Sequence, residues 1–138
     1  MARQYNYGAR NREHSALHLN NNIMDTRTAK NNLRKGKKLE QEMAKRFRDI
    51  GFDKCKTSRY ASRENDDNKC DLSYCVPFNV QCKSHVNFSN PIPVMESMPK
   101  DENYNVLIQR VKNKGTYAIM TMDDFMCLVE VLRSEGII

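Results

Sequence analysis

The sequence predicts an α/β (α+β) domain in which a mixed central β-sheet is flanked by helices. Short apolar runs of strand length stand in the middle of the chain, separated by turn residues and a proline-rich stretch. Amphipathic helical patterns precede and follow these runs. The order of helix, strands, connection, strands and helix is typical of a sheet with helices packed against it, and 138 residues fit one such domain.

The front of the chain is polar, rich in Asn and weakly periodic. We interpret residues 1–33 as a basic, mostly flexible arm with one short helix at 13–19, and residues 34–138 as the folded domain. Residues 1–46 carry 11 Lys/Arg and 4 Asp/Glu, whereas residues 47–138 carry 12 and 13. This distribution predicts contact with a polyanion such as nucleic acid, and the alternative is a solvated tail that aids solubility.

An amphipathic helix opens the domain at residues 34–50. Its apolar residues recur at steps of four, four and three, at Leu39, Met43, Phe47 and Ile50. Gly51 follows them as a natural helix stop. We expect a short strand within residues 52–60 and a polar loop at residues 61–69.

Two strand-like runs follow at residues 71–76 and 79–84. Pro77-Phe78 separates them, and this spacing predicts a hairpin. Residues 85–103 carry three prolines and predict a long connection with at most short structured pieces.

The C-terminal part predicts two strands and a helix. The strands are expected at residues 105–111 and 116–121, joined by turn chemistry at Asn113-Lys114-Gly115. Thr121 and Asp124 form a capping pattern that opens the last helix, and Gly136 ends it.

The clearest chemical pattern consists of Asp71, Gln81 and Lys83. Side chains alternate between the faces of a strand, so Gln81 and Lys83 point the same way while Val80 and Cys82 can enter a core. Asp71, on the neighbouring strand of the predicted hairpin, can reach the same cleft. Mg²⁺ prefers oxygen ligands, and a lysine can orient a water or stabilise developing negative charge. The plain alternative is an Asp that caps a turn and a solvated lysine.

A second carboxylate is expected from the preceding helix. On a helical wheel, Glu40 and Glu42 fall on opposite edges of the apolar stripe, so the pattern alone leaves both open. Lys35, Lys37 and Lys38 stand at the expected helix start, where backbone donors and the helix dipole would favour phosphate contact.

Several short motifs follow one another along residues 34–133. They are the basic helix start Gly36-Lys37-Lys38-Leu39-Glu40, the helix end Gly51-Phe52, the polar-loop residues Arg59, Ser62 and Arg63, then Asp71, the strand Gln81-Cys82-Lys83, the strands Asn105–Val111 and Thr116–Thr121, and Asp123-Asp124-Phe125. Their order and spacing resemble the PD-(D/E)XK nuclease superfamily, specifically its phage-type, Holliday-junction-resolvase-like members.

This resemblance implies a restriction-endonuclease-like core and a metal-dependent, structure-selective endonuclease that cuts branched DNA such as Holliday junctions during recombination. It implies Mg²⁺, with Mn²⁺ as the alternative, no organic cofactor, and a homodimer. Asp71, Gln81 and Glu40 would hold the metal, and Lys83 would complete the catalytic set. Glu42 is the second choice for Glu40. The residues expected to contact DNA are Arg34, Lys35, Lys37, Lys38, Arg59, Ser62 and Arg63.

The sequence departs from the family pattern at two positions. Cys70 stands where a proline usually precedes the Asp, and Gln81 stands where an acidic residue is usual. An amide oxygen can bind a hard cation but lacks the charge that holds it tightly. Two further functions therefore stay open: a DNA-binding protein on a nuclease fold with weakened chemistry, and a restriction- or repair-type nuclease that cuts ordinary duplex.

The cysteines and the hydropathy indicate where the protein works. Five cysteines occur, an odd number without a Cys-x-x-Cys pair, so we expect reduced thiols in a cytoplasmic protein, one that a phage could encode. A zinc site from Cys70, Cys75, Cys82 and His85 matches no standard spacing, and buried thiols are favoured instead. No apolar run approaches the ~20 residues that cross a bilayer.

Overall fold

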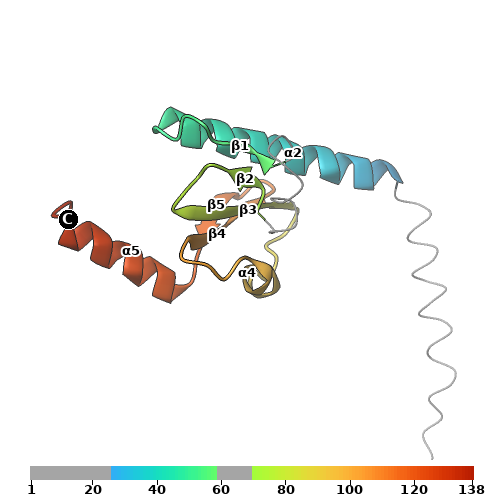
Figure 1. Ribbon diagram of the computed structural model, residues 1–138. Helices are drawn as coiled ribbons and strands as arrows, with labels where there is room; N and C mark the ends of the chain where they lie inside the picture. The colour runs from blue at the N-terminus through green and yellow to red at the C-terminus, as the bar shows by residue number, and fades with distance from the viewer. Residues whose placement is uncertain (1–25, 59–69) are drawn as a thin grey trace, which may run out of the picture. The chain divides into compact units, whose positions relative to one another are not determined.

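The computed structural model describes residues 26–58 and 70–138 (Figure 1). The chain divides into two compact units, Met1–Arg34 and Lys35–Ile138. Its elements are, in order, α2 (Thr26–Asp49), β1 (Lys56–Thr57), β2 (Leu72–Ser73), β3 (Phe78–His85), α4 (Ile92–Ser97), β4 (Tyr104–Val111), β5 (Gly115–Ile119) and α5 (Met122–Ser134). The expected helix at 13–19 and the polar loop at 61–69 lie outside the described residues. The mixed helix-and-strand architecture is confirmed.

Helix α2 differs from the expected helix in where it begins and in the last residue of its apolar stripe. It begins at Thr26, eight residues before the expected start at 34, and its first turns have no buried side chain that would reveal them in the sequence. Leu39 and Met43 are buried as expected, but Ile50 lies beyond the helix and is 74% exposed, so its place in the stripe was wrong.

Helix α2 ends shortly before Gly51, as the sequence predicted. The Phe52 N–H donates to the Phe47 carbonyl (3.0 Å), and the Gly51 N–H donates to the Arg48 carbonyl (3.1 Å). Gly51 has φ 112°, the left-handed conformation in which glycine carries no side-chain penalty. Gly51 therefore stops the helix and turns the chain toward β1.

The main sheet is mixed, with the strand order β3-β4-β5. β3 pairs with β4 in parallel, and β4 pairs with β5 antiparallel. The predicted hairpin is wrong: the short β2 pairs with β1 instead, and β3 reaches its partner β4 through the connection that contains α4. A parallel partner needs such a crossover, whereas the sequence showed only that two strands were close along the chain.

The core lies between α2 and one face of the sheet (Figure 1). Leu39 and Met43 of α2 join Val80 and Cys82 of β3 and Ile108 of β4 in one buried cluster. The alternate residues of these strands belong to the opposite face, where Asp101 and Ser89 of the connection between β3 and β4 bond to Asn79 and Gln109. β3 is therefore covered on both faces.

The last helix, α5, begins with the predicted cap. The Thr121 hydroxyl accepts from the Asp124 N–H at 3.1 Å, and Gly136 follows the helix with φ 68°. None of its residues is buried. Among the described helices, none is both long and apolar enough to cross a membrane.

We predict that the α2–sheet contact carries much of the stability. Leu39→Ala should lower the free energy of unfolding by about 2–5 kcal/mol, because the side chain is fully buried and leaves a cavity. The matched control Ile50→Ala should change it by no more than about 0.5 kcal/mol, because that side chain is mostly in water. Urea unfolding followed by circular dichroism measures both. Equal losses in the two variants would contradict this packing.

Candidate active site

Asp71 is held at the free edge of β3. Its backbone N–H donates to the Val80 carbonyl (2.7 Å), and its carbonyl accepts from the Ser58 N–H (2.8 Å). Its carboxylate Oδ2 accepts from the Cys82 N–H at 2.7 Å. A backbone donor fixed in a strand orients the carboxylate, so Asp71 is a rigid acidic group beside the strand that carries Gln81 and Lys83.

Glu40 lies in the same neighbourhood, on the α2 side of β3. Its side chain is buried although it is ionisable, with 7% of its surface exposed. Burial raises the pKa of the Cys82 thiol, and the negative charges of Asp71 and Glu40 raise it further. Both carboxylates therefore act electrostatically on the Cys82 thiol.

Glu42, the alternative to Glu40, is engaged elsewhere. Its two carboxylate oxygens accept from the Arg110 guanidinium at 2.9 Å each, and Arg110 Nε also donates to Thr116. This bidentate pair ties α2 to β4 and β5. The hydrogen bond from Arg110 lowers the pKa of Glu42 below its usual 4.5. Glu42 is therefore engaged by Arg110, whereas Glu40 is buried on the side of α2 that meets the core.

Gln81 and Lys83 share a strand face, as alternation requires, but it is the face opposite Cys82 and Glu40. Gln81 is buried, with 8% exposed, and Lys83 is partly exposed. The Gln81 Oε1 atom is buried without a hydrogen-bond partner among residues 26–58 and 70–138. Such an oxygen is costly to bury, so it marks a place where a donor or a cation would be stabilising.

Other amide side chains on this face have hydrogen-bond partners for both their oxygen and their nitrogen. Gln109 accepts from the Ser89 N–H (2.8 Å) and donates to the Ser89 carbonyl (3.2 Å). Asn105 donates to the Pro99 carbonyl at 2.7 Å. These side chains fasten the connection between β3 and β4 to the sheet, and the sequence analysis missed them. Amides at alternate positions of buried strands were the available signal.

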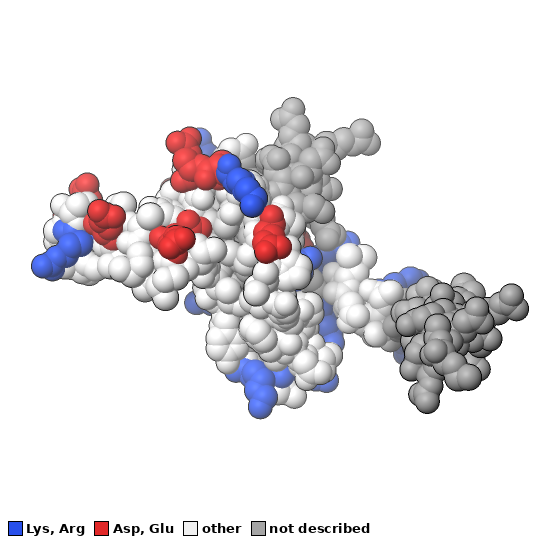
Figure 2. Space-filling model, turned by 90° about the horizontal axis from the view of Figure 1, so that it is seen from below, with Lys and Arg blue, Asp and Glu red and all other residues white. Residues whose placement is uncertain are grey.

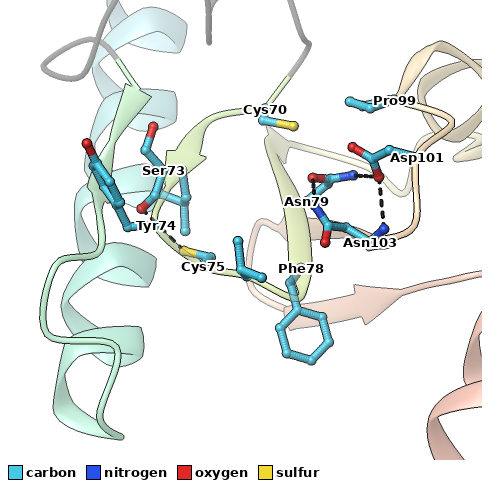
Figure 3. A pocket seen from close by; sticks show the side chains of 11 residues that line it. Cys70, Ser73, Tyr74, Cys75, Phe78, Asn79, Pro99, Asp101 and Asn103 are labelled. Atoms are coloured by element: carbon cyan, nitrogen blue, oxygen red, sulfur yellow. Dashed lines mark hydrogen bonds between the residues drawn. The ribbon is translucent and has the colours of Figure 1, made fainter.

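A pocket of about 410 Å³ opens beside Asp71, lined in part by its two chain neighbours, Cys70 and Leu72. Figure 3 shows a hydrogen-bonded group on one side of it, made by Asn79, Asp101 and Asn103. On the other side lie Ser73, Tyr74 and Cys75 (Figure 3). This pocket leaves no pattern in the sequence, because its walls come from segments that are separated in the chain.

All five cysteines are free thiols; Cys55, Cys75 and Cys82 are buried in the core, whereas Cys127 is exposed on α5. The sulfurs of Cys55 and Cys75 are 2.8 Å apart, and both residues are buried. Burial raises the pKa of Cys70 to about 11, with help from the nearby charges of Asp101 and Asp71. Within the described parts of the chain, no three His, Cys, Asp or Glu side chains are arranged to hold a metal ion, so the zinc alternative gains no support there.

The basic residues expected to contact DNA lie mainly on α2. This helix has nine Lys/Arg against three Asp/Glu, and the expected DNA contacts Arg34, Lys35, Lys37 and Lys38 are exposed. They stand inside the helix, not at its start, so the expected backbone donors of a helix N-terminus are absent at these positions. Arg59, Ser62 and Arg63 lie outside the described residues.

The face seen from below differs from α2 in its charge. Figure 2 shows Lys and Arg side chains scattered there among Asp and Glu, without a continuous basic patch among the described residues. A polyanion would therefore be favoured along α2 and not on this face.

Comparisons with protein-family models, with characterised proteins and with solved structures found no match to this chain. The nuclease resemblance therefore rests on the motif residues of the sequence alone.

We predict that the Glu42–Arg110 pair stabilises the fold only above acidic pH. Because Arg110 lowers the pKa of Glu42, the contribution is present above the unfolded pKa of 4.5 and is lost as the pH falls through the lower folded value. Glu42→Gln should cost about 0.5–1 kcal/mol at pH 7, since both side chains stay partly in water. Urea unfolding at pH 7 and at pH 3 measures the difference.

The exposed Glu130→Gln is the matched control, because Glu130 lies on α5, where no residue is buried. It should leave the unfolding free energy unchanged at both pH values. A Glu42→Gln deficit that persists undiminished at pH 3 would show that the ion pair is not its cause.

Proposed function

We propose that this protein is a metal-dependent endonuclease that cuts branched DNA such as Holliday junctions, and that it acts as a homodimer. One observation carries the proposal: the Cys82 N–H holds the half-buried Asp71 carboxylate at the edge of β3, the strand that also carries Gln81 and Lys83. An oriented carboxylate is the kind of ligand that a hard divalent cation prefers. The buried Glu40 on α2 is a candidate second carboxylate, and the basic α2 suits a polyanionic substrate.

The residues present fit a Mg²⁺ site of the usual kind, which takes one or two carboxylates with waters completing the shell. Asp71 would be the principal ligand. Glu40 and Gln81 lie on opposite faces of β3, so one ion bound by Asp71 would take a direct ligand from only one of these two faces. The orphaned Gln81 Oε1 is the further oxygen that such a site could use. A bound Mg²⁺ would polarise the phosphate and acidify an attacking water.

Lys83 supports the same chemistry. It follows Gln81 by two residues on the same face of β3 and is partly exposed, so its ammonium group can approach a phosphate outside the strand. There it would orient the nucleophile or stabilise the negative charge that develops on the phosphate. In this proposal Lys83 neutralises charge on the phosphate, and the carboxylates bind the metal.

A second function is favoured by Gln81 itself. With an amide in place of an acid, the site carries one negative charge fewer for a cation, which suits a DNA-binding protein with weakened cleavage. The two functions share the basic α2 and differ in whether DNA is hydrolysed. A restriction- or repair-type nuclease differs from both in cutting linear duplex as well as a junction.

We predict that the purified protein nicks a four-way junction in Mg²⁺ and that Asp71→Asn and Lys83→Met each reduce the rate at least about 100-fold. Glu40→Gln should reduce it as well, whereas Glu42→Gln, whose side chain is paired with Arg110, should retain most activity. Junction and matched linear duplex are compared on denaturing gels, with binding measured in Ca²⁺. Tight binding without cleavage would establish the second function, and equal cutting of duplex the third.

We predict that Gln81→Glu places a carboxylate where a cation can compensate it. Without Mg²⁺ this variant should have a lower Tm than wild type, because a buried charge without a partner is destabilising. Saturating Mg²⁺ should restore several degrees, since a ligand at 100 times its Kd stabilises by about 2.7 kcal/mol. Gln109→Glu, buried on the same face but bonded to Ser89, is the control that Mg²⁺ should not rescue. Equal rescue of both variants, or of neither, would remove Gln81 from the metal site.

A further inference from the structure

Helix α5 has an apolar face that the described residues of its own chain leave largely exposed. Met122, Phe125 and Met126 are 69%, 46% and 53% exposed. With Val129 and Leu132 they recur at helical spacing, so they form one stripe along the helix. A helix of 13 residues is marginal in water by itself and usually depends on the packing of such a stripe. The stripe therefore predicts a partner surface.

A groove of about 330 Å³ lies between the C-terminal part of α2 and the sheet. Its lining is mostly apolar: Phe47 and Ile50 come from the end of α2 and just after it, Ile108 from β4 and Ala118 from β5. Ile50 is 74% exposed at this groove. No α5 residue is among those that line it. The groove therefore offers an apolar surface that α5 of the same copy does not fill.

The groove and the helix carry opposite charges. Arg46 lines the groove, and α2 as a whole has nine Lys/Arg against three Asp/Glu. Helix α5 has three Asp/Glu against one Lys/Arg, and Asp123 and Asp124 stand in its first turn beside the stripe. Opposite charges around an apolar contact favour one pairing and orientation over others. Arg46 would repel a basic segment, so charge favours an acidic helix as the occupant of the groove.

We propose that α5 of a second copy lies in this groove and that the contact is reciprocal, so that two copies exchange their last helices. The inference rests on the proposed function for the homodimer and assigns the surface that forms it. Only Met120 and Thr121 separate β5 from α5, and Ala118 of β5 lines the groove. The start of α5 is therefore close to the groove of its own copy, and a two-fold axis there would satisfy both contacts in one closed dimer.

The test measures self-association of the full chain by analytical ultracentrifugation over a range of concentrations. Wild type should form dimers, and Phe125→Asp should weaken them at least about 30-fold, because it places a charge within the apolar contact. Val131→Asp is the matched control, because Val131 is 48% exposed on the same helix but lies outside the stripe. A wild type that stays monomeric, or equal effects of the two substitutions, would overturn the inference.

Two groove variants separate this contact from a pairing of α5 with α5. Ala118→Glu puts a charge that repels the acidic helix into the groove, and Arg46→Glu reverses the charge that attracts it. Each should weaken the dimer about ten-fold or more. Lys114→Glu, the same charge change at an exposed lysine outside the groove lining, should leave the affinity unchanged. Dimers of wild-type affinity in both groove variants would overturn the inference.

A mixture of two variants tests whether the contact is reciprocal. In a dimer of Phe125→Asp with Ala118→Glu, the unchanged helix of one copy meets the unchanged groove of the other, so one contact stays intact. Neither variant can form an intact contact with itself. Mixed dimers, counted by native mass spectrometry, should therefore outnumber the dimers of either variant alone. The absence of this excess would overturn the exchange of helices.

Folding and cleavage are measured on the same proteins. Below the Kd of the dimer, Phe125 and Ile50 stay in water, so Phe125→Asp should match wild type in urea unfolding. A wild-type dimer that Phe125→Asp dissociates, without nicking of a four-way junction in Mg²⁺, would support this interface and overturn the nuclease. Junction cleavage by a wild type that stays monomeric at every concentration would overturn the interface and leave the nuclease standing.

Discussion

The structure depends on β3 being covered on one face by apolar side chains and on the other by polar ones. Val80 and Cys82 meet the apolar side chains of α2, whereas Asn79 and Gln81 lie on the face where the connection between β3 and β4 is fastened. Because successive residues of a strand alternate, neither set can move without displacing the other. This constraint fixes α2, and with it Glu40, on one side of Asp71, and the polar connection on the other.

Local features were predictable from the sequence, and long-range ones were not. The stripe of Leu39 and Met43, the stop at Gly51 and the cap at Thr121 depend on residues within one or two helical turns, so the pattern contained them. The start of α2 at Thr26 could not be predicted, because a helical segment with no buried face leaves no apolar period. The parallel pairing of β3 with β4 likewise depends on segments that are distant in sequence.

The same distinction between local and long-range features applies to the candidate site. Alternation predicted that Gln81 and Lys83 share a face, but it could not say which face of the sheet α2 would cover. Only the packed structure places Glu40 with Cys82, and Gln81 opposite. The choice between Glu40 and Glu42 also required the fold, since Arg110, which occupies Glu42, lies 68 residues further along the chain.

Charge separates a region of this domain that attracts a nucleic-acid backbone from one that repels it. The exposed lysines and arginines of α2 attract phosphate without regard to sequence. The Asp101 carboxylate, held by the Asn79 side chain and the Asn103 N–H, acts in the opposite sense and repels phosphate at the pocket. Attraction along α2 and repulsion at the pocket together would orient a bound backbone along the helix and keep it out of the pocket, an orientation that neither feature provides alone.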